Sequence, residues 1–140
     1  MPFGSDLTIL PTYQAIALSK VELVCFSLED ILTSPTLTQS IFTRVNKRLH
    51  QTEALLAISG QRHVKDRLHH LLLLLKQEIG QPVAAGTRLN VRFTHQDIAD
   101  ACSTTRVTIT RLLGKLQEEE KIILDSKNHI ILKEQFQRGY

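Results

Sequence analysis

The segment Thr94–Leu116, THQDIADACSTTRVTITRLLGKL, has the pattern of two short helices joined by a tight corner. Thr94 can cap the first helix, because its hydroxyl can accept a hydrogen bond from a free amide of the first turn. Asp97 stands three residues later, as the acidic partner of a capping box. Residues 102–104 are expected to form the turn, and Thr104 or Thr105 can cap the helix that follows.

The second helix of this segment divides its side chains between two faces. The apolar ones are expected to be buried: Val107, Ile109, Leu112, Leu113 and Leu116. The polar ones point elsewhere: Arg106, Thr108, Thr110 and Arg111. Two arginines with hydroxyls between them suit a helix N-terminus that lies in the major groove of DNA. The alternative is a helix corner that serves core packing alone.

The net charge of +3 over 140 residues is too small to indicate nucleic-acid binding, but its distribution is informative. Residues 1–43 carry a net charge of −3, residues 44–92 carry +6, and residues 93–140 are neutral. The middle of the chain is therefore expected to form an electropositive flank that could face phosphates. An ordinary solvated helix surface is the alternative.

The cysteines and the apolar runs indicate the compartment. Cys25 and Cys102 lie far apart in the sequence, which favours two buried thiols in a reducing environment over a disulfide. No signal peptide is apparent, and the longest apolar run, Leu71–Leu75, is far too short to cross a bilayer. We expect a cytoplasmic protein with no membrane partner.

A long helix is predicted to begin at Ser34-Pro35, a hydroxyl cap followed by proline. Apolar residues recur along it at helical spacing up to about Gly60: Leu37, Ile41, Val45, Leu49 and Leu56. A stripe of this length needs a long partner, and a second copy of the same helix is the simplest one, which predicts a homodimer. The alternative is an ordinary core helix.

The remaining segments predict an α+β fold. Residues 13–27 have strand-like composition, residues 61–79 are helical, residues 81–87 form a loop and residues 88–93 a strand. Residues 121–124 and 129–132 form a hairpin, and a hairpin after a helix corner forms a wing. We expect three parts: residues 1–31, the remnant of a β-roll; residues 32–60, a dimerisation helix; and residues 61–140, a winged helix-turn-helix domain.

The segment from Arg48 to Leu132 resembles the C-terminal half of the Crp/Fnr superfamily of transcription regulators. The resemblance is to the branch of the cyanobacterial global nitrogen regulator, and it rests on three motifs: RLHQTE, FTHQDIA and STTRVTITRLLGKL. Residues 13–27 resemble the last strands of that family's effector-binding roll. The resemblance implies a transcription regulator, an activator in some relatives, that binds double-stranded DNA as a dimer.

The resemblance also assigns DNA contacts. Arg106 and Arg111 match the family arginines that read guanine edges, where a bidentate contact contributes about 1–3 kcal/mol of discrimination. Val107 stands where the cyclic-AMP receptor has glutamate. Because valine cannot accept a hydrogen bond from a cytosine amino group, it is expected to favour a thymine methyl or to allow looser readout, and the resemblance implies a GTA…TAC-like palindrome. Four residues match positions that hold phosphates: His95, Gln96, Thr105 and Thr108. Ser103 replaces the usual glycine of the turn.

An effector site is implied less completely. Arg48 and Glu53 match dimer-helix residues that contact 2-oxoglutarate in the nitrogen regulator, and Phe3-Gly4 resembles the backbone corner of the same pocket. The family arginine of the preceding strand is replaced here by Pro11 or Thr12. An ion pair between Arg48 and Glu53 is the alternative to a 2-oxoglutarate site.

Other functions find little support. The six histidines lack zinc-site spacing, and two distant cysteines cannot hold an iron–sulfur cluster. No nucleophile stands beside a base and no glycine loop could cradle a phosphate, so neither a metal nor catalysis is expected. Two alternatives to a homodimeric regulator stay open. One is a module that dimerises with a paralogue, and the other is a 2-oxoglutarate-responsive sensor. By analogy with the family, RNA polymerase would contact the surface near Pro82–Asn90.

Overall fold

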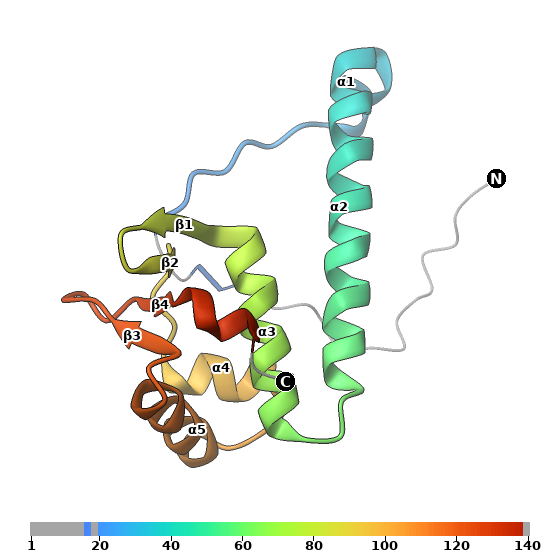
Figure 1. Ribbon diagram of the computed structural model, residues 1–140. Coiled ribbons are helices and arrows are strands. Elements are labelled where there is room, and N and C mark those ends of the chain that lie inside the picture. Colours follow the sequence, from blue (N-terminus) through green and yellow to red (C-terminus); the bar gives the residue numbers. More distant parts are fainter. Residues whose placement is uncertain (1–15, 18–19, 139–140) are drawn as a thin grey trace.

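The computed structural model describes residues 16–17 and 20–138. One long helix, α2 (Pro35–Ser59), stands beside a compact unit that contains all the other elements except the short helix α1 (Leu28–Thr33) (Figure 1). Only Ile58 of α2 is buried, whereas the compact unit encloses the apolar core. The α+β fold expected from the sequence is confirmed.

Both N-terminal helices begin at serine caps. The Ser27 side chain accepts a hydrogen bond from the backbone N–H of Asp30, and the Asp30 carboxylate accepts one from the Ser27 N–H, which completes a capping box. The Ser34 hydroxyl accepts from the N–H of Leu37 at the start of α2, as predicted from Ser34-Pro35. The helix ends at Gly60, also as predicted.

The helix α3 (Val64–Ile79) leads directly into a hairpin that the sequence reading missed. Its strands are β1 (Gly80–Val83) and β2 (Gly86–Leu89). The predicted loop at 81–87 is therefore wrong, and the predicted strand at 88–93 is correct only for residues 88 and 89. The tight turn requires glycine at position 86 for two reasons. Its φ of 138° is a backbone conformation that residues with a side chain rarely adopt, and a Cβ there would lie 2.3 Å from the Leu132 carbonyl oxygen. Pro82 is tolerated because β1 is an edge strand.

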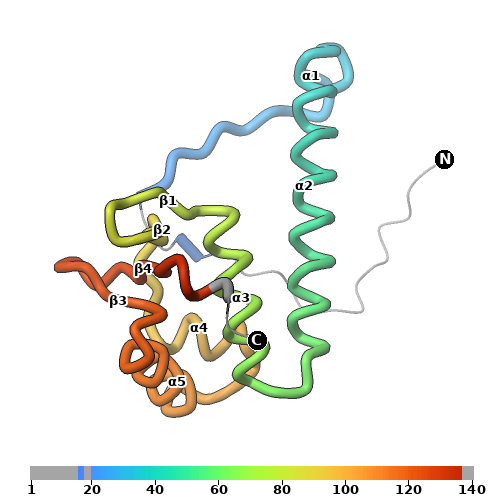
Figure 2. Tube along the Cα trace, viewed as in Figure 1, coloured from blue at the N-terminus to red at the C-terminus, as the bar shows by residue number. Residues whose placement is uncertain are grey.

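The sheet joins this hairpin to the wing. After α4 (His95–Ala101) and α5 (Arg106–Glu118) come β3 (Ile122–Leu124) and β4 (Ile130–Leu132), and the antiparallel strand order is β1-β2-β4-β3. The predicted wing hairpin is therefore confirmed, and β4 pairs with β2 (Figure 2). A short 3₁₀ helix, Glu134–Arg138, follows β4.

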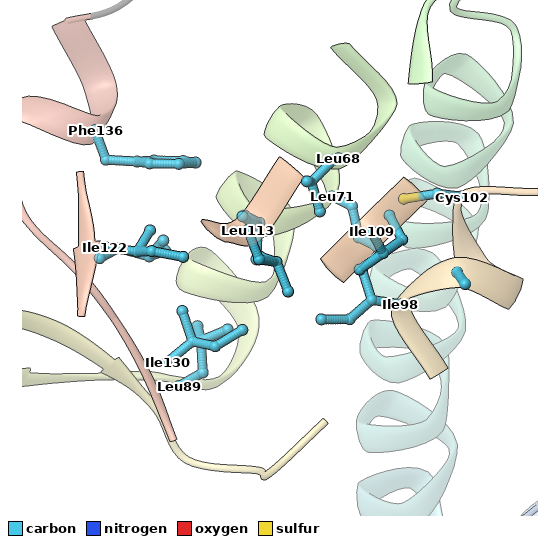
Figure 3. Packing of buried hydrophobic residues seen from close by; sticks show 13 residues of the cluster. Leu68, Leu71, Leu89, Ile98, Cys102, Ile109, Leu113, Ile122, Ile130 and Phe136 are labelled. Carbon is cyan, nitrogen blue, oxygen red and sulfur yellow. The ribbon is translucent and has the colours of Figure 1, made fainter. Parts of the chain in front are cut away.

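The core lies where α3, α4, α5 and the sheet converge (Figure 3). Its fully buried side chains come from every one of these layers: Leu68, Leu72, Leu89, Ile98, Ile109, Ile122 and Leu132. Phe136 closes the core from the 3₁₀ helix and stacks on the ring of His69, with the ring centroids 4.7 Å apart. This continuous packing holds the helix corner rigidly against the sheet.

Residues 20–27 differ from the sequence expectation. They form neither strand nor helix, and Val21, Leu23 and Val24 are more than half exposed. An apolar run becomes a strand only when a neighbouring strand pairs with its backbone, and no described strand lies in register with this one. Cys25 is exposed too, so only Cys102 is the buried thiol that was expected. Residues 13–15 and 18–19 of the predicted strand segment lie outside the described part of the chain.

Candidate nucleic-acid interface

The first helix of the corner is capped as the sequence predicts. The Thr94 hydroxyl accepts a hydrogen bond from the Asp97 N–H at 3.1 Å, and the Asp97 carboxylate accepts from the Thr94 N–H at 2.7 Å. Both bonds satisfy amides that would otherwise have no partner at the helix start. The beginning of α4 is thus fixed by local sequence.

The turn between the helices is tight. Ser103 has a φ of 48°, in the left-handed region. This conformation costs less energy for glycine than for serine. The backbone N–H of Thr104 donates to the Ala99 carbonyl, which closes the turn. Cys102 is fully buried, and this burial raises the pKa of its thiol. The thiol therefore acts as a small apolar group in the core.

The helix α5 begins at Thr105, whose hydroxyl accepts from the N–H of Thr108 at 3.2 Å. The two hydroxyls also hydrogen-bond each other at 2.9 Å. Thr105 and Thr108, both proposed phosphate contacts, are therefore held together at the N-terminus of the helix. Free amides and the helix dipole favour an anion at such an end.

The exposed face of α5 contains the three proposed base-reading residues. Val107 is 77% exposed, which corrects its assignment to the buried side, whereas Ile109 and Leu113 are buried. Arg106 and Arg111 are exposed, and together with Val107 and Thr110 they line a shallow depression of about 470 Å³. An apolar side chain with this exposure between two free guanidinium groups is well placed to contact a binding partner.

A hydrogen bond between the two helices was not anticipated from the sequence. Nδ1 of His95 lies 2.8 Å from the Thr110 hydroxyl oxygen, and that hydroxyl donates to the Arg106 carbonyl at 2.9 Å. Because the hydroxyl has only one proton, the His95 ring must donate, and its Nδ1 therefore carries hydrogen. Gln96, the neighbouring proposed phosphate contact, donates instead to Asp100 at 2.7 Å.

A groove separates α5 from the wing. It has a volume of about 520 Å³, and its polar lining includes Arg92, His95, Arg106 and Asn128. Arg92 and Asn128 were missed by sequence reasoning. Arg92 belongs to a segment expected to be strand, and Asn128 sits at the wing turn with a φ of 62°. The only available signals were the basic residue before the helix cap and an asparagine suited to the left-handed region.

The wing turn is organised by one carboxylate. Asp125 accepts from the backbone N–H groups of Lys127 and His129, both at 2.8 Å, and from the His129 ring at 3.0 Å. The backbone hydrogen bond from His129 is the main reason why the pKa of Asp125 is lowered. The Arg88 guanidinium lies 3.7 Å away and links the β1–β2 hairpin to the wing. Lys127 is thereby presented, exposed, at the tip.

The predicted dimer residues divide into two groups. Val45, Leu49 and Leu56 are more than half exposed, but Leu37 and Ile41 are half-buried within the single chain. Phe42 is also more than half exposed, and it precedes Val45 by three residues. We call these four exposed side chains the α2 stripe: Phe42, Val45, Leu49 and Leu56. Together with Thr52, which lies between Leu49 and Leu56, these residues are separated alternately by three and four positions. This spacing is that of the contact positions of a heptad repeat.

Two of the four proposed effector residues lie within the described part of the chain. Arg48 and Glu53 are both exposed on α2, and Phe3 and Gly4 lie outside the described residues. Glu53 is 3.2 Å from the His50 ring, and the described residues of this single chain form no ion pair between Arg48 and Glu53. Within the described residues, no cluster of three metal-ligating side chains occurs, and no helix is long and apolar enough to cross a membrane.

The fold and this surface define a winged helix-turn-helix module. The Crp-like helix-turn-helix domain matches residues 66–135, and the chain belongs to that family. This confirms the resemblance noted from its sequence motifs.

Relatives of known name place it among the Crp/Fnr regulators. The chain is 34% identical to the global nitrogen regulator of Nostoc sp. over 119 residues, which are 82% of this chain and 53% of that protein. It is 34% identical to the regulatory protein CysR of Synechococcus elongatus over 122 residues, 85% of this chain and 55% of that one. The chain thus spans little more than half the length of these relatives.

Solved structures share the architecture. The CooA mutant from Carboxydothermus hydrogenoformans superposes with a TM-score of 0.69 at 18% identity, covering 79% of this chain and 50% of that one. At this level of identity the likeness concerns the fold alone. It extends beyond the matched domain into the N-terminal part of the chain, because residues 66–135 make up only half of it.

Proposed function

We propose that this protein is a transcription regulator that binds a GTA…TAC-like palindrome in double-stranded DNA as a homodimer. The observation that carries the proposal is the exposed face of α5, where Val107 stands between Arg106 and Arg111. Family membership supports the class of function.

Base reading follows from the chemistry of that face. A guanidinium can donate two parallel hydrogen bonds to the O6 and N7 atoms of guanine, and neither Arg106 nor Arg111 has its side chain engaged in an ion pair among the described residues. Val107 can contact a thymine methyl but cannot accept a hydrogen bond from cytosine. This combination favours guanine and thymine within each half-site.

Phosphate contacts would surround the base-reading face. His95 and Gln96 begin α4, and Thr105 and Thr108 begin α5, so all four lie at helix starts with free amide groups. Arg92 lines the same groove as His95 and adds a cation to this set. Such contacts position the duplex without reading its sequence, and they make binding depend strongly on salt.

Homodimerisation is supported by the α2 stripe. A side chain such as Phe42 or Leu49 gains about 1.5–3 kcal/mol when it passes from water into an apolar contact. A parallel pair of α2 helices would bury both stripes and would present two recognition helices. Half-sites about 34 Å apart, one turn of DNA, would then be read by the two copies.

An activating role would use a different surface. The β1–β2 turn and residues 132–135 border an open cleft of about 870 Å³, in the region where the family resemblance locates polymerase contacts. Val83 is exposed at its edge. RNA polymerase is therefore the proposed partner of this surface, and DNA is the proposed partner of α5.

The test is a titration of a labelled GTA…TAC duplex with the wild-type chain and with Arg106→Ala, at one fixed salt concentration. We expect the variant to lose its preference for the palindrome over a scrambled duplex while retaining salt-dependent nonspecific binding. Arg44→Ala is the matched control, because Arg44 is an exposed arginine on α2 outside the stripe. An Arg106→Ala variant with unchanged preference would exclude this mode of readout.

A further inference from the structure

Two contacts position α2 relative to α3. Near the linker, Ile58 of α2 is buried. Near the C-terminal end of α3, Glu78 faces α2, and its Oε2 atom accepts from Lys47 Nζ at 2.8 Å and from Gln51 Nε2 at 2.7 Å. Lys47 and Gln51 are four residues apart, so they lie on one face of the helix. One carboxylate therefore joins two side chains of α2 to α3.

The two helices are not closely packed throughout that end. A cleft of about 540 Å³ lies between them, lined by polar side chains such as Asn46, His50 and Gln77 and by the apolar Ala54 and Leu74. Interlocking side chains ordinarily fix the angle between two helices, and the cleft interrupts such packing beside Glu78. The Glu78 carboxylate stays ionised at neutral pH, because the hydrogen bond from Lys47, and to a lesser extent the one from Gln51, lowers its pKa.

The linker between the helices can act as a pivot. Gly60 has ordinary right-handed backbone angles, φ −73° and ψ −11°, and an added Cβ would lie 3.5 Å from its nearest neighbour. Neither the turn nor the packing therefore requires glycine at this position. What glycine adds is backbone freedom.

The other side of the pivot is fixed to the DNA-binding unit. The Arg67 guanidinium donates to the Gln61 carbonyl through Nη1 and to the Cys102 carbonyl through Nε, both at 2.8 Å. Residue 61 is thus tied to the turn between α4 and α5. Any rotation of α2 against the DNA-binding unit is then concentrated at Gly60 and opposed by Glu78.

We propose that Glu78 is a positioning residue for palindrome recognition. Through Lys47 and Gln51 it sets the angle between α2 and the winged helix-turn-helix unit, and so it fixes the distance and rotation between the two recognition helices of a dimer. The proposal rests on the proposed homodimeric DNA binding. It adds a determinant of half-site spacing that makes no contact with DNA.

The angle itself can be measured without DNA. Two spin labels are attached to cysteines introduced by Gln39→Cys on α2 and Gln117→Cys on α5, in a Cys25→Ser background. When labelled protein is diluted into a large excess of unlabelled protein, the labels report a single distance within one chain. We expect a narrow distance distribution for the parent, a broad one for Glu78→Ala, and a narrow one again for the reciprocal exchange Lys47→Glu with Glu78→Lys. Glu118→Ala, an exposed carboxylate on α5, is the control. A broad distribution in the parent, or a narrow one in Glu78→Ala, would overturn the proposal.

The consequence for DNA is tested with palindromes whose half-sites are moved apart or together one base pair at a time. Each step rotates a half-site by about 35° around the duplex. We expect the wild type to prefer one spacing sharply, whereas in Glu78→Ala the affinity ratio between the best and the neighbouring spacings falls toward one. Affinity for an isolated half-site should not change, and the reciprocal exchange should restore the preference.

The two experiments separate two kinds of failure. An unchanged spacing profile in Glu78→Ala, or an equal loss of affinity for the isolated half-site, would contradict the positioning role. If the wild type binds no palindrome at all, the proposed function fails, but the distance measurement still decides whether Glu78 fixes the angle of α2.

Discussion

The imidazole of His95, at the start of α4, donates a hydrogen bond from Nδ1 to the hydroxyl of Thr110 in α5 across 2.8 Å. The same hydroxyl donates to the Arg106 carbonyl, so the bond joins the first helix of the corner to the backbone that carries the proposed base-reading arginine. Buried Ile98 and Ile109 pack the two helices from the core side. The His95–Thr110 bond adds a fixed point on the exposed side.

Thr110→Val should weaken this link with little change in shape. We expect a loss of roughly 0.5–1 kcal/mol in the free energy of unfolding, at the lower end for hydrogen bonds because the pair is accessible to water, together with weaker binding to the palindrome. Denaturant titration and DNA titration measure the two effects. Thr43→Val on α2 is the control, because it removes only a bond within its own helix. Equal results for the two variants would show that the interhelical bond has no role.

Phe42→Asp should disrupt dimer formation. A carboxylate at the first position of the α2 stripe would have to lose its hydration shell in the seam, which is costly without a partner. Sedimentation velocity is expected to show a monomer at concentrations where the wild type is a dimer, and affinity for the palindrome should fall to that for a half-site. Arg44→Asp, outside the stripe, should leave the dimer intact. A dimeric Phe42→Asp variant would mean that chains associate through another surface.

Val107→Glu should change which base is preferred rather than how tightly DNA is bound overall. A glutamate can accept from the amino group of cytosine, so the preference at the contacted base pair should move from thymine toward cytosine by about 1–3 kcal/mol. A set of duplexes varied at each position of one half-site measures this. Val107→Thr serves as the control, since it keeps a methyl group and the branched shape. An identical base preference in wild type and Val107→Glu would place residue 107 away from the bases.

Asp125→Asn should make the protein less sensitive to acid. The folded-state pKa of Asp125 is lowered from the ordinary value of 3.8, chiefly by the His129 N–H, so the ionised carboxylate contributes stability above that value. The contribution is lost as pH falls through the lowered folded pKa. An asparagine oxygen can still accept the turn hydrogen bonds but does not titrate. Unfolding midpoints between about pH 2 and 5 should therefore fall less steeply in the variant. Glu118→Gln is the reference for losing an exposed carboxyl, and identical slopes for both variants would contradict the assignment.

Local chemistry made the corner and the long helix predictable. Caps such as Thr94, Thr105 and Ser34 act over three or four residues, so their effect can be recognised in the sequence alone. The wing was predictable for a similar reason, since two short β-branched runs flank a polar turn. The helix-turn-helix, the start of α2 and the wing all followed from such short-range signals.

The features that were missed depend on tertiary contacts. The hairpin strand β2 pairs with β4, far along the chain, and Gly86 lies against the Leu132 carbonyl there. The exposed position of Val107, and the choice of Phe42 rather than Leu37 for the stripe, depend on which helix face meets the rest of the fold. Residues 20–27 have strand composition, but composition cannot supply a pairing partner.

The base-reading residues of the site were easier to predict from the sequence than the residues that surround them. Arg106 and Arg111 could be singled out by residue type and helix position. Arg92, Asn128 and the His95–Thr110 bond could not, because each depends on how the wing and α4 fold back toward α5. The role proposed for Glu78 depends in the same way on a contact with residues 27 and 31 positions earlier in the chain.

The most direct measurement is the affinity of the wild-type protein for a symmetric GTA…TAC duplex compared with two matched duplexes at the same salt concentration. One duplex has a single half-site scrambled and the other has both scrambled. We expect strong binding to the intact palindrome, a large loss of affinity when one half-site is scrambled, and only salt-dependent nonspecific binding when both are scrambled. Equal affinity for all three duplexes would contradict sequence-specific recognition by a dimer.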